Sequence, residues 1–191
     1  MATPLAPTSD YHFKTVSNRL GLWLFIISDT FIFLALLLTR FYLLGGHRPD
    51  VNQTLGLGVT TVLLLSSFCM NRAEVCIAHG DRKNFLLFTL VTLLLGLGFL
   101  FGVVGVEWRL APFNASDNVT GAVFFFLTGM HAFHVLTGVL FLSIVLRNGY
   151  KGLYSAERHW PVEACANYWH YVDVVWVFIY PSLYLLGTVA R

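Results

Sequence analysis

The apolar residues of this chain fall into five long blocks that are separated by short polar turns. The hydrocarbon core of a bilayer is about 30 Å thick, and a helix of roughly 20 apolar residues can cross it. Each block reaches that length, so each predicts a membrane-spanning helix. The five predicted spans are residues 19–44, 55–78, 85–108, 119–147 and 164–189.

The composition agrees with this pattern. Of the 191 residues, 57% are hydrophobic and 12% are charged, whereas about a quarter of the residues in a soluble domain are charged. The mean hydropathy is +0.69. We therefore expect an all-α fold, a polytopic membrane helix bundle, with residues 19–191 forming a single five-helix transmembrane domain. Residues 1–18 are expected to form an N-terminal cytoplasmic tail, which lacks the apolar stretch of a signal peptide.

The distribution of Lys and Arg predicts the orientation of the bundle, because cytoplasmic loops are enriched in these residues. The N-terminal tail and the second and fourth turns together hold eight of them, and the opposite side of the membrane holds four. We expect the N-terminus inside and the C-terminus outside. No basic run indicates binding to nucleic acid.

Two features inside the spans predict local geometry. Gly98 and Gly102 have the four-residue spacing of small residues that lets transmembrane helices approach closely. Pro181 lacks a backbone N–H and therefore cannot donate to the carbonyl of Val177, so we expect a bend in the fifth span.

Asp29 is a carboxyl group near the middle of the first span. A charged, unpaired carboxylate at this depth costs on the order of 3 kcal/mol or more. Two interpretations stay open at this point. Asp29 is either a neutral acid that is hydrogen-bonded to a neighbouring helix, or a functional acid that handles protons or contacts another subunit.

Five further polar residues lie in or beside the last two spans. His131 and His134 share one face of the fourth span, while Glu163 and His170 align on the fifth and Asp173 lies about 60° away. A polar flank on a transmembrane helix must face other protein, lipid head groups or water. We expect interhelical polar contacts at all five, with His170 and Asp173 pairing with groups such as His131 or His134.

The sequence does not predict a metal or haem site. His131 and His134 lie on the same side of their helix, whereas haem held between helices needs an imidazole on each side. Cys69, Cys76 and Cys165 lack metal-ligand spacing and are expected to be small apolar residues. A small haem-binding cytochrome and an independent proton or ion transporter are retained as competing functions. The sequence has no internal repeat of the kind that is common in transporters.

Several segments together resemble one protein family. YWHYVDVVWVFIYPSLYLLG, residues 168–187, closely resembles the last helix of subunit III of haem–copper cytochrome oxidases. Three further segments, which come earlier in the chain, occur in the same order as in the family. The resemblance covers roughly residues 18–188. They are GLWLFIISD, which starts at residue 21, GDRKN at residue 80, and EWRLAPFNASDNVTGAVFFFLTGMHAFHVLTG at residue 107.

The resemblance implies a core subunit of a respiratory terminal oxidase that itself carries no redox centre. Haem and copper would belong to partner subunits I and II, and this chain would stabilise subunit I, support proton uptake and guide lipid or oxygen. It would be the five-helix form, without the first two helices of the family, in the cytoplasmic (inner) membrane of a bacterium. Subunit III of a quinol oxidase is the alternative, because Asp29 stands where Glu is commoner.

The resemblance also assigns roles to individual residues. Asp29 matches the buried acid that the family links to proton uptake and to modification by carbodiimides. Arg147, Arg158 and His159, near the turn before the last span, are candidates for contacts with phospholipid head groups. The expected partners are oxidase subunits I and II, membrane phospholipid and other respiratory complexes.

Overall fold

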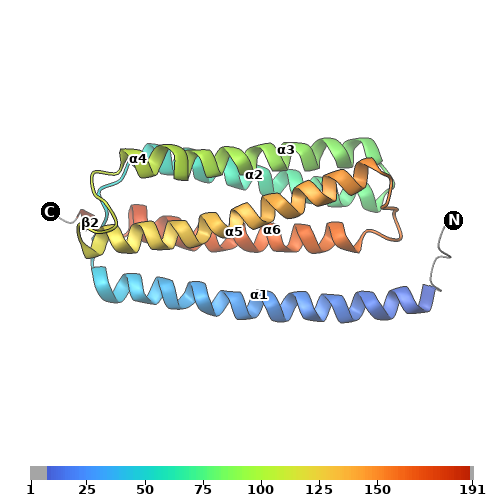
Figure 1. Cartoon of the computed structure of the whole chain (residues 1–191), viewed down its shortest axis with the longest axis horizontal. Coiled ribbons are helices and arrows are strands. Elements are labelled where there is room, and N and C mark those ends of the chain that lie inside the picture. Colours follow the sequence, from blue (N-terminus) through green and yellow to red (C-terminus); the bar gives the residue numbers. More distant parts are fainter. Residues whose placement is uncertain (1–7, 190–191) are drawn as a thin grey trace.

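The computed structural model describes residues 8–189, with side chains from residue 13 onward. Five long helices lie side by side, which confirms the predicted all-α membrane bundle (Figure 1). Four of them, all except the last, are long and apolar enough to cross a membrane within the described part of the chain. The helices are α1 (Thr8–Leu44), α2 (Gln53–Ala78), α3 (Arg82–Leu100), α5 (Val119–Tyr150) and α6 (Trp160–Tyr180).

Polar side chains cap the starts of three helices. The side chain of Asn52 accepts a hydrogen bond from the Leu55 amide, and Asn118 accepts one from the Gly121 amide. Asp81 accepts one from the amide of Asn84, and this bond lowers the pKa of the Asp81 carboxyl. These caps satisfy amides that have no partner inside the helix. The helices begin at the caps, so α2 and α3 start a few residues before the predicted spans.

The first helix differs most from its predicted boundaries. It begins at Thr8 rather than near residue 19, so the predicted tail 1–18 is helical from residue 8 and only residues 1–7 lie outside the described part. The predicted boundary was based on apolar content. Apolar content indicates which residues lie in the hydrocarbon core, but not where the helix begins or ends. A helix whose backbone is already paired can continue into water with polar side chains.

Two segments with wider, π-helical turns extend α3 and α6. The segment η1 (Phe101–Glu107) leads into the short α4 (Trp108–Leu110), and η2 (Pro181–Leu185) follows α6. In η2 the Leu186 amide donates to the Pro181 carbonyl at 2.9 Å, across five residues. The regular α-helical hydrogen bonding therefore ends at Pro181, and the predicted bend stays a prediction.

A short parallel strand pair ties the C-terminal end of the described chain to the turn after α1. Strand β1 (His47–Arg48) pairs with β2 (Thr188–Val189). The backbone of Gly187 has φ +104°, and a side chain there would meet the Gly46 carbonyl oxygen. Only glycine fits this turn without strain.

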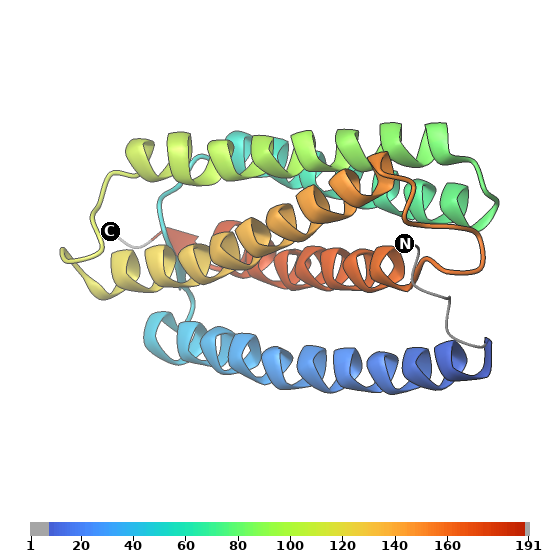
Figure 2. The ribbon, with the colours of Figure 1, turned by 45° about the vertical axis from the view of Figure 1, so that its right-hand side comes forward.

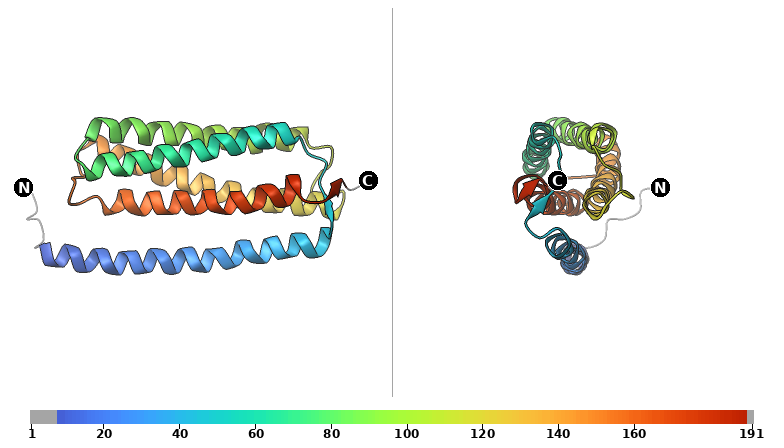
Figure 3. Two further views of the ribbon diagram at one scale, coloured as in Figure 1. Left: turned by 180° about the vertical axis from the view of Figure 1, so that it is seen from behind. Right: turned by 90° about the vertical axis from the view of Figure 1, so that its left-hand side faces the viewer.

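The core lies among α2, α3, α5 and α6, and α1 stands to one side of them (Figures 2 and 3). The ring of Trp169 is fully buried, and side chains added at Gly96 and Gly138 would lie 2.5 and 2.8 Å from it. Of the predicted glycine pair, Gly102 packs tightly, because an added Cβ would lie 2.5 Å from a Val59 methyl group. Gly98 has ordinary contact distances.

Candidate functional site

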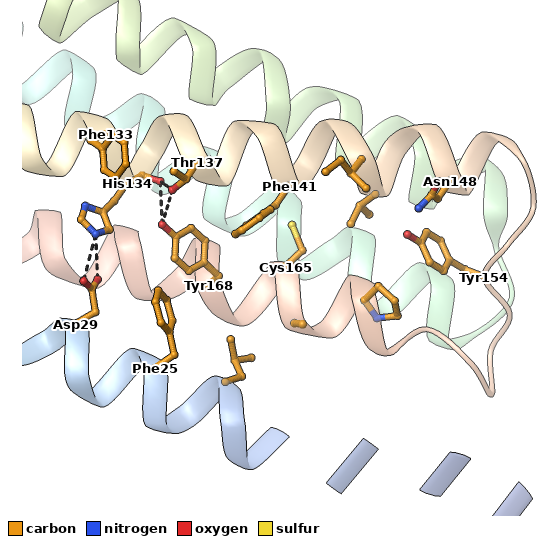
Figure 4. Close-up of a pocket in the computed structure, with 15 residues that line it drawn as sticks. Phe25, Asp29, Phe133, His134, Thr137, Phe141, Asn148, Tyr154, Cys165 and Tyr168 are labelled. Carbon is orange, nitrogen blue, oxygen red and sulfur yellow. Dashed lines mark hydrogen bonds and ion pairs between the residues drawn. The ribbon is translucent and has the colours of Figure 1, made fainter. Parts of the chain in front are cut away.

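A cavity of about 710 Å³ lies between α1 on one side and α5 and α6 on the other. Figure 4 shows the side chains that line it. Most of them are apolar or aromatic, including Phe25 from α1, Phe141 from α5 and Cys165 from α6. Asp29 and His134 form a polar boundary at one end, and Asn148 and Tyr154 lie at the other.

Asp29 and His134 form a buried pair between α1 and α5. His134 Nε2 lies 3.3 and 3.2 Å from the two carboxyl oxygens of Asp29, and both residues are more than 90% buried. His134 Nδ1 lies 2.7 Å from the Met130 carbonyl oxygen. A carbonyl oxygen only accepts, so Nδ1 carries a hydrogen, and the bond to Asp29 needs one proton between Nε2 and the carboxyl group. Asp29 and His134 therefore share one exchangeable proton.

Neighbouring groups fix the position of His134. The hydroxyl groups of Thr137 and Tyr168 are 2.6 Å apart, and their oxygens lie 2.8 and 3.2 Å from the His134 carbonyl oxygen. Each hydroxyl has one hydrogen, so one of them donates to this carbonyl and the other donates to the neighbouring hydroxyl. The ring of Phe33 meets the imidazole edge-on with centroids 4.8 Å apart. The α5 backbone and the imidazole are thus both held beside the cavity.

Glu163, which was predicted to make an interhelical contact, meets α1 near the N-terminal end of that helix. Glu163 Oε2 accepts a hydrogen bond from Arg19 at 2.9 Å, and the Arg19 guanidinium carbon lies 5.7 Å from the centre of the Trp160 ring. Because the Arg19 side chain is 52% exposed, this ion pair is screened by solvent.

His170 and Asp173 face α2 rather than the histidines of α5. His170 Nδ1 lies 2.6 Å from the Ser67 hydroxyl, and Asp173 is buried beside the same serine. Neither Asp173 carboxyl oxygen has a hydrogen-bond partner within residues 8–189. The predicted pairing with His131 or His134 is wrong because those two imidazoles point elsewhere.

His131 lies in an aromatic layer of the core. It is fully buried, with ring centroids 4.8 Å from Trp176 and 5.5 Å from Phe99. Neither imidazole nitrogen has a hydrogen-bond partner in the described chain, so the expected interhelical hydrogen bond at His131 is not present. Three residues on a helix correspond to 300°, so when His134 faces α1 its neighbour His131 turns into the bundle.

The three candidates for lipid head groups lie at the same end of the molecule. Arg147 is in the last turn of α5, and Arg158 and His159 lie in the connection to α6. His159 Nδ1 lies 3.2 Å from the Ser155 carbonyl oxygen. Their role in lipid binding stays a prediction.

Two buried charged residues, Arg40 and Glu107, were not predicted from the sequence. Arg40 is 1% exposed and donates to the carbonyl oxygens of Gly45, His47 and Leu186, at 3.3, 3.1 and 3.0 Å. Glu107, in η1, is 2% exposed and lies beside Tyr184 of η2. Each lies close to an end of an apolar block, where a charge is easily taken as a marker of the membrane surface.

Within residues 8–189, no group of three His, Cys, Asp or Glu side chains could hold a metal ion. Cys69, Cys76 and Cys165 are free thiols. The chemistry that this arrangement supports is the holding of a proton by Asp29 and His134, together with the binding of apolar material in the adjacent cavity.

Comparison with known proteins gives a consistent match. Residues 6–188 match the model of the family "Cytochrome c oxidase subunit III". The chain is 38% identical over 183 residues to cytochrome c oxidase subunit 3 of Xenopus laevis, and 37% identical to those of Gadus morhua and Salmo salar. Each match covers 89% of this chain and 70% of the relative.

Proposed function

Since the chain belongs to the cytochrome c oxidase subunit III family, we propose that it is the non-redox core subunit III of a haem–copper terminal oxidase. The observation that carries this proposal is the family match over residues 6–188. In this role the chain works beside subunits I and II, which hold the haem and copper groups. Its own residues supply structure, proton handling and an apolar surface, and the oxygen chemistry takes place in its partners.

The proton-handling part of the proposal rests on Asp29 and His134. Their shared proton lies between α1 and α5, beside an apolar cavity that leads toward the turn before α6. When this proton moves between the carboxyl group and the imidazole, the net charge of the pair stays at zero, so no uncompensated charge is left in the membrane. We assign it a role in supporting proton uptake by subunit I and in protecting that subunit during turnover.

The lipid part of the proposal rests on the cavity. Its volume of about 710 Å³ and its apolar lining suit the acyl chain of a phospholipid or a path for oxygen. The head group would then meet the end of the molecule that holds Arg147, Arg158 and His159. Because cationic side chains attract phosphate, these three are the assigned contacts.

The chain is a multi-pass membrane protein, and we assign it to the cytoplasmic membrane of a bacterium. The N-terminal end of α1 is assigned to the cytoplasmic side, because eight Lys and Arg residues lie on that side and four on the other.

Co-purification tests the proposal most directly. A tagged wild-type chain should isolate from its native membranes together with haem- and copper-containing subunits, while the separated chain should show no Soret absorbance. Stoichiometric haem on the separated chain would support a small cytochrome instead. Isolation of the chain without any haem–copper partner would overturn the proposed function.

The Asp29→Ala variant tests the division of work inside the complex. In the proposed function this chain holds no redox centre, so Asp29 does not take part in oxygen reduction. The initial rate of oxygen reduction by the variant should therefore stay within about threefold of wild type, which corresponds to a change of under about 1 kcal/mol in the barrier. Proton release into vesicles should weaken, or inactivation over many turnovers should accelerate. Immediate loss of oxygen reduction, with haem and copper retained, would place Asp29 closer to the chemistry than we propose.

A hydrophobic carbodiimide gives a separate readout on the wild-type complex. The apolar cavity gives such a reagent a path to Asp29. We expect labelling at Asp29 in preference to the exposed acid Glu157, measured by peptide mass spectrometry. Equal labelling of both acids would contradict access through the cavity.

A further inference from the structure

The contacts between α2 and α6 define an antiparallel register. Trp176 donates to the Thr60 hydroxyl at 2.9 Å, and Trp169 donates to the Ser66 hydroxyl at 3.0 Å. Both bonds are buried. The next residue, Ser67, meets His170 at 2.6 Å, where both side chains are only partly buried. From the Thr60–Trp176 contact to the Ser66–Trp169 contact, residue numbers rise along α2 and fall along α6, so the two helices run side by side in opposite directions (Figure 3).

This register continues along one outward face toward the predicted cytoplasmic end. Two helical turns beyond Ser67, Glu74 lies within electrostatic range of Glu163, which is two turns before His170. Asn71 and Asn167 fall between these two levels. All of these side chains are partly or largely exposed. We call this set the polar groove: Ser67, Asn71, Glu74, Glu163, Asn167 and His170.

The other half of the same face is apolar. Leu57 and Leu64 of α2 and Val174 and Val177 of α6 are exposed there. Such side chains suit lipid, whereas those of the polar groove do not. The groove also reaches deep, because His170 lies ten residues beyond the start of α6 at Trp160, which is roughly 15 Å along the helix. That is about half of a hydrocarbon core of about 30 Å.

At two levels of the groove, one polar group lacks a partner among the described residues. His170 uses Nδ1 for Ser67, and its Nε2 makes no hydrogen bond within the described residues. At the other level, Glu163 pairs with Arg19, while Glu74 lies within electrostatic range of Glu163 and His159 and has no ion pair among the described residues. The groove therefore needs a hydrogen-bonding group at mid-membrane depth and a positive charge near its end.

We propose that the polar groove is the docking site for a transmembrane helix of another subunit. That helix presents a hydroxyl, amide or carboxyl side chain opposite His170 and a Lys or Arg opposite Glu74. This inference rests on the proposed function, which places the chain in a multi-subunit complex. A phospholipid head group does not supply the contact at His170, because it stays at the membrane surface.

Site-specific photo-cross-linking in the whole complex tests the docking site. A benzoylphenylalanine residue replaces Asn71 in the groove, and in a matched control it replaces Leu94, which is 57% exposed on α3. We expect the Asn71 position to give at least fivefold more adduct with another subunit than the Leu94 position. Equal yields, or adducts of Asn71 with phospholipid only, would overturn the inference.

A pair of substitutions at His170 tests the hydrogen bond at mid-depth. The fraction of chain retained in the detergent-purified complex should fall severalfold for His170→Leu and recover in part for His170→Gln, which keeps polar hydrogen-bonding groups. Equal retention of both variants and wild type would count against docking at this level. If the wild-type chain does not co-purify, the proposed function fails and this inference fails with it. If the chain co-purifies but the photo-reactive residue at the Asn71 position forms no protein adduct, only the assignment of the polar groove as a docking site is wrong.

Discussion

The first helix and the group formed by α2, α3, α5 and α6 are held in place by different physical means. In the most apolar stretch of α1, 17% of the residues are buried, against 44% in α5. The four-helix group packs glycines against large rings, as at Trp169, and α1 has no comparable contact. Its buried positions include Ile26, Asp29 and Phe33, which follow a single face.

Polar attachments hold α1 instead. Arg19 pairs with Glu163 near one end, Asp29 pairs with His134 in the middle, and Arg40 binds backbone carbonyls at the other end. Burial from water does not drive helix association inside lipid, so helices associate through close packing or through polar contacts. This molecule uses packing for one part and polar contacts for the other, and the space left beside α1 becomes the cavity.

Removing a packed ring should have the largest effect. Trp169→Ala should lower the free energy of unfolding by about 3–5 kcal/mol, because it leaves a cavity between Gly96 and Gly138 and removes the bond to Ser66. The matched control is Trp23→Ala on α1, where the ring is 53% exposed and the change should stay within about 0.5 kcal/mol. Unfolding in mixed detergent micelles measures both. Equal losses would mean that α1 is packed as tightly as the group.

Removing the attachment at Arg40 should have the next largest effect on stability. Arg40→Met removes a buried guanidinium and leaves three carbonyl oxygens without its hydrogen bonds, at a cost of about 2–3 kcal/mol. Hydrogen exchange should rise at β1 and β2, which the guanidinium helps to hold together. Arg48→Gln on the same strand is the control. If Arg40→Met leaves the hydrogen-exchange protection of β1 and β2 unchanged, strand pairing alone holds this end of α1.

The sequence was sufficient to predict the number and type of the helices, because long apolar blocks have few alternatives. It did not predict that α1 starts at Thr8, since polar residues form helix outside the membrane as readily as a loop. It also did not predict η1, where Phe101–Glu107 reads as an ordinary apolar helix. Wider turns of this kind depend on contacts with neighbouring helices.

The candidate site was predictable by residue but not by partner. Asp29 stands out as a carboxyl group in an apolar block, and His134 was also singled out, yet nothing in the sequence pairs them. Pairing depends on how each helix is rotated, and that rotation is decided by packing around residues such as Trp169. Ser67, the actual partner of His170, gives no signal in the sequence because serine is common in membrane helices.

Removing the middle attachment of α1, the pair of Asp29 and His134, should have a smaller effect. Its size should depend on whether the new side chain is able to form a hydrogen bond. Asp29→Leu leaves His134 Nε2 buried without a partner and should cost about 1–2 kcal/mol. Asp29→Asn should cost less than half as much, because its amide is able to donate to Nε2 of the neutral imidazole. The same unfolding assay in detergent compares them. An equal loss for both variants would indicate that the pair requires an ionised carboxylate.

The ion pair of Arg19 and Glu163 should show the smallest effect, since a pair whose arginine is half exposed gains little over water. A double-mutant cycle of Arg19→Ala and Glu163→Ala should give a coupling energy of about 0.2–1 kcal/mol. The single variant Arg19→Ala should cost more than Glu163→Ala, because it also removes the contact with Trp160. Raising the salt concentration to about 1 M shortens the screening length to about 3 Å, so the coupling should largely disappear. A coupling that exceeds about 2 kcal/mol, or one that ignores salt, would mean that this end of α1 is shielded from water and that the contrast with the four-helix group is weaker there.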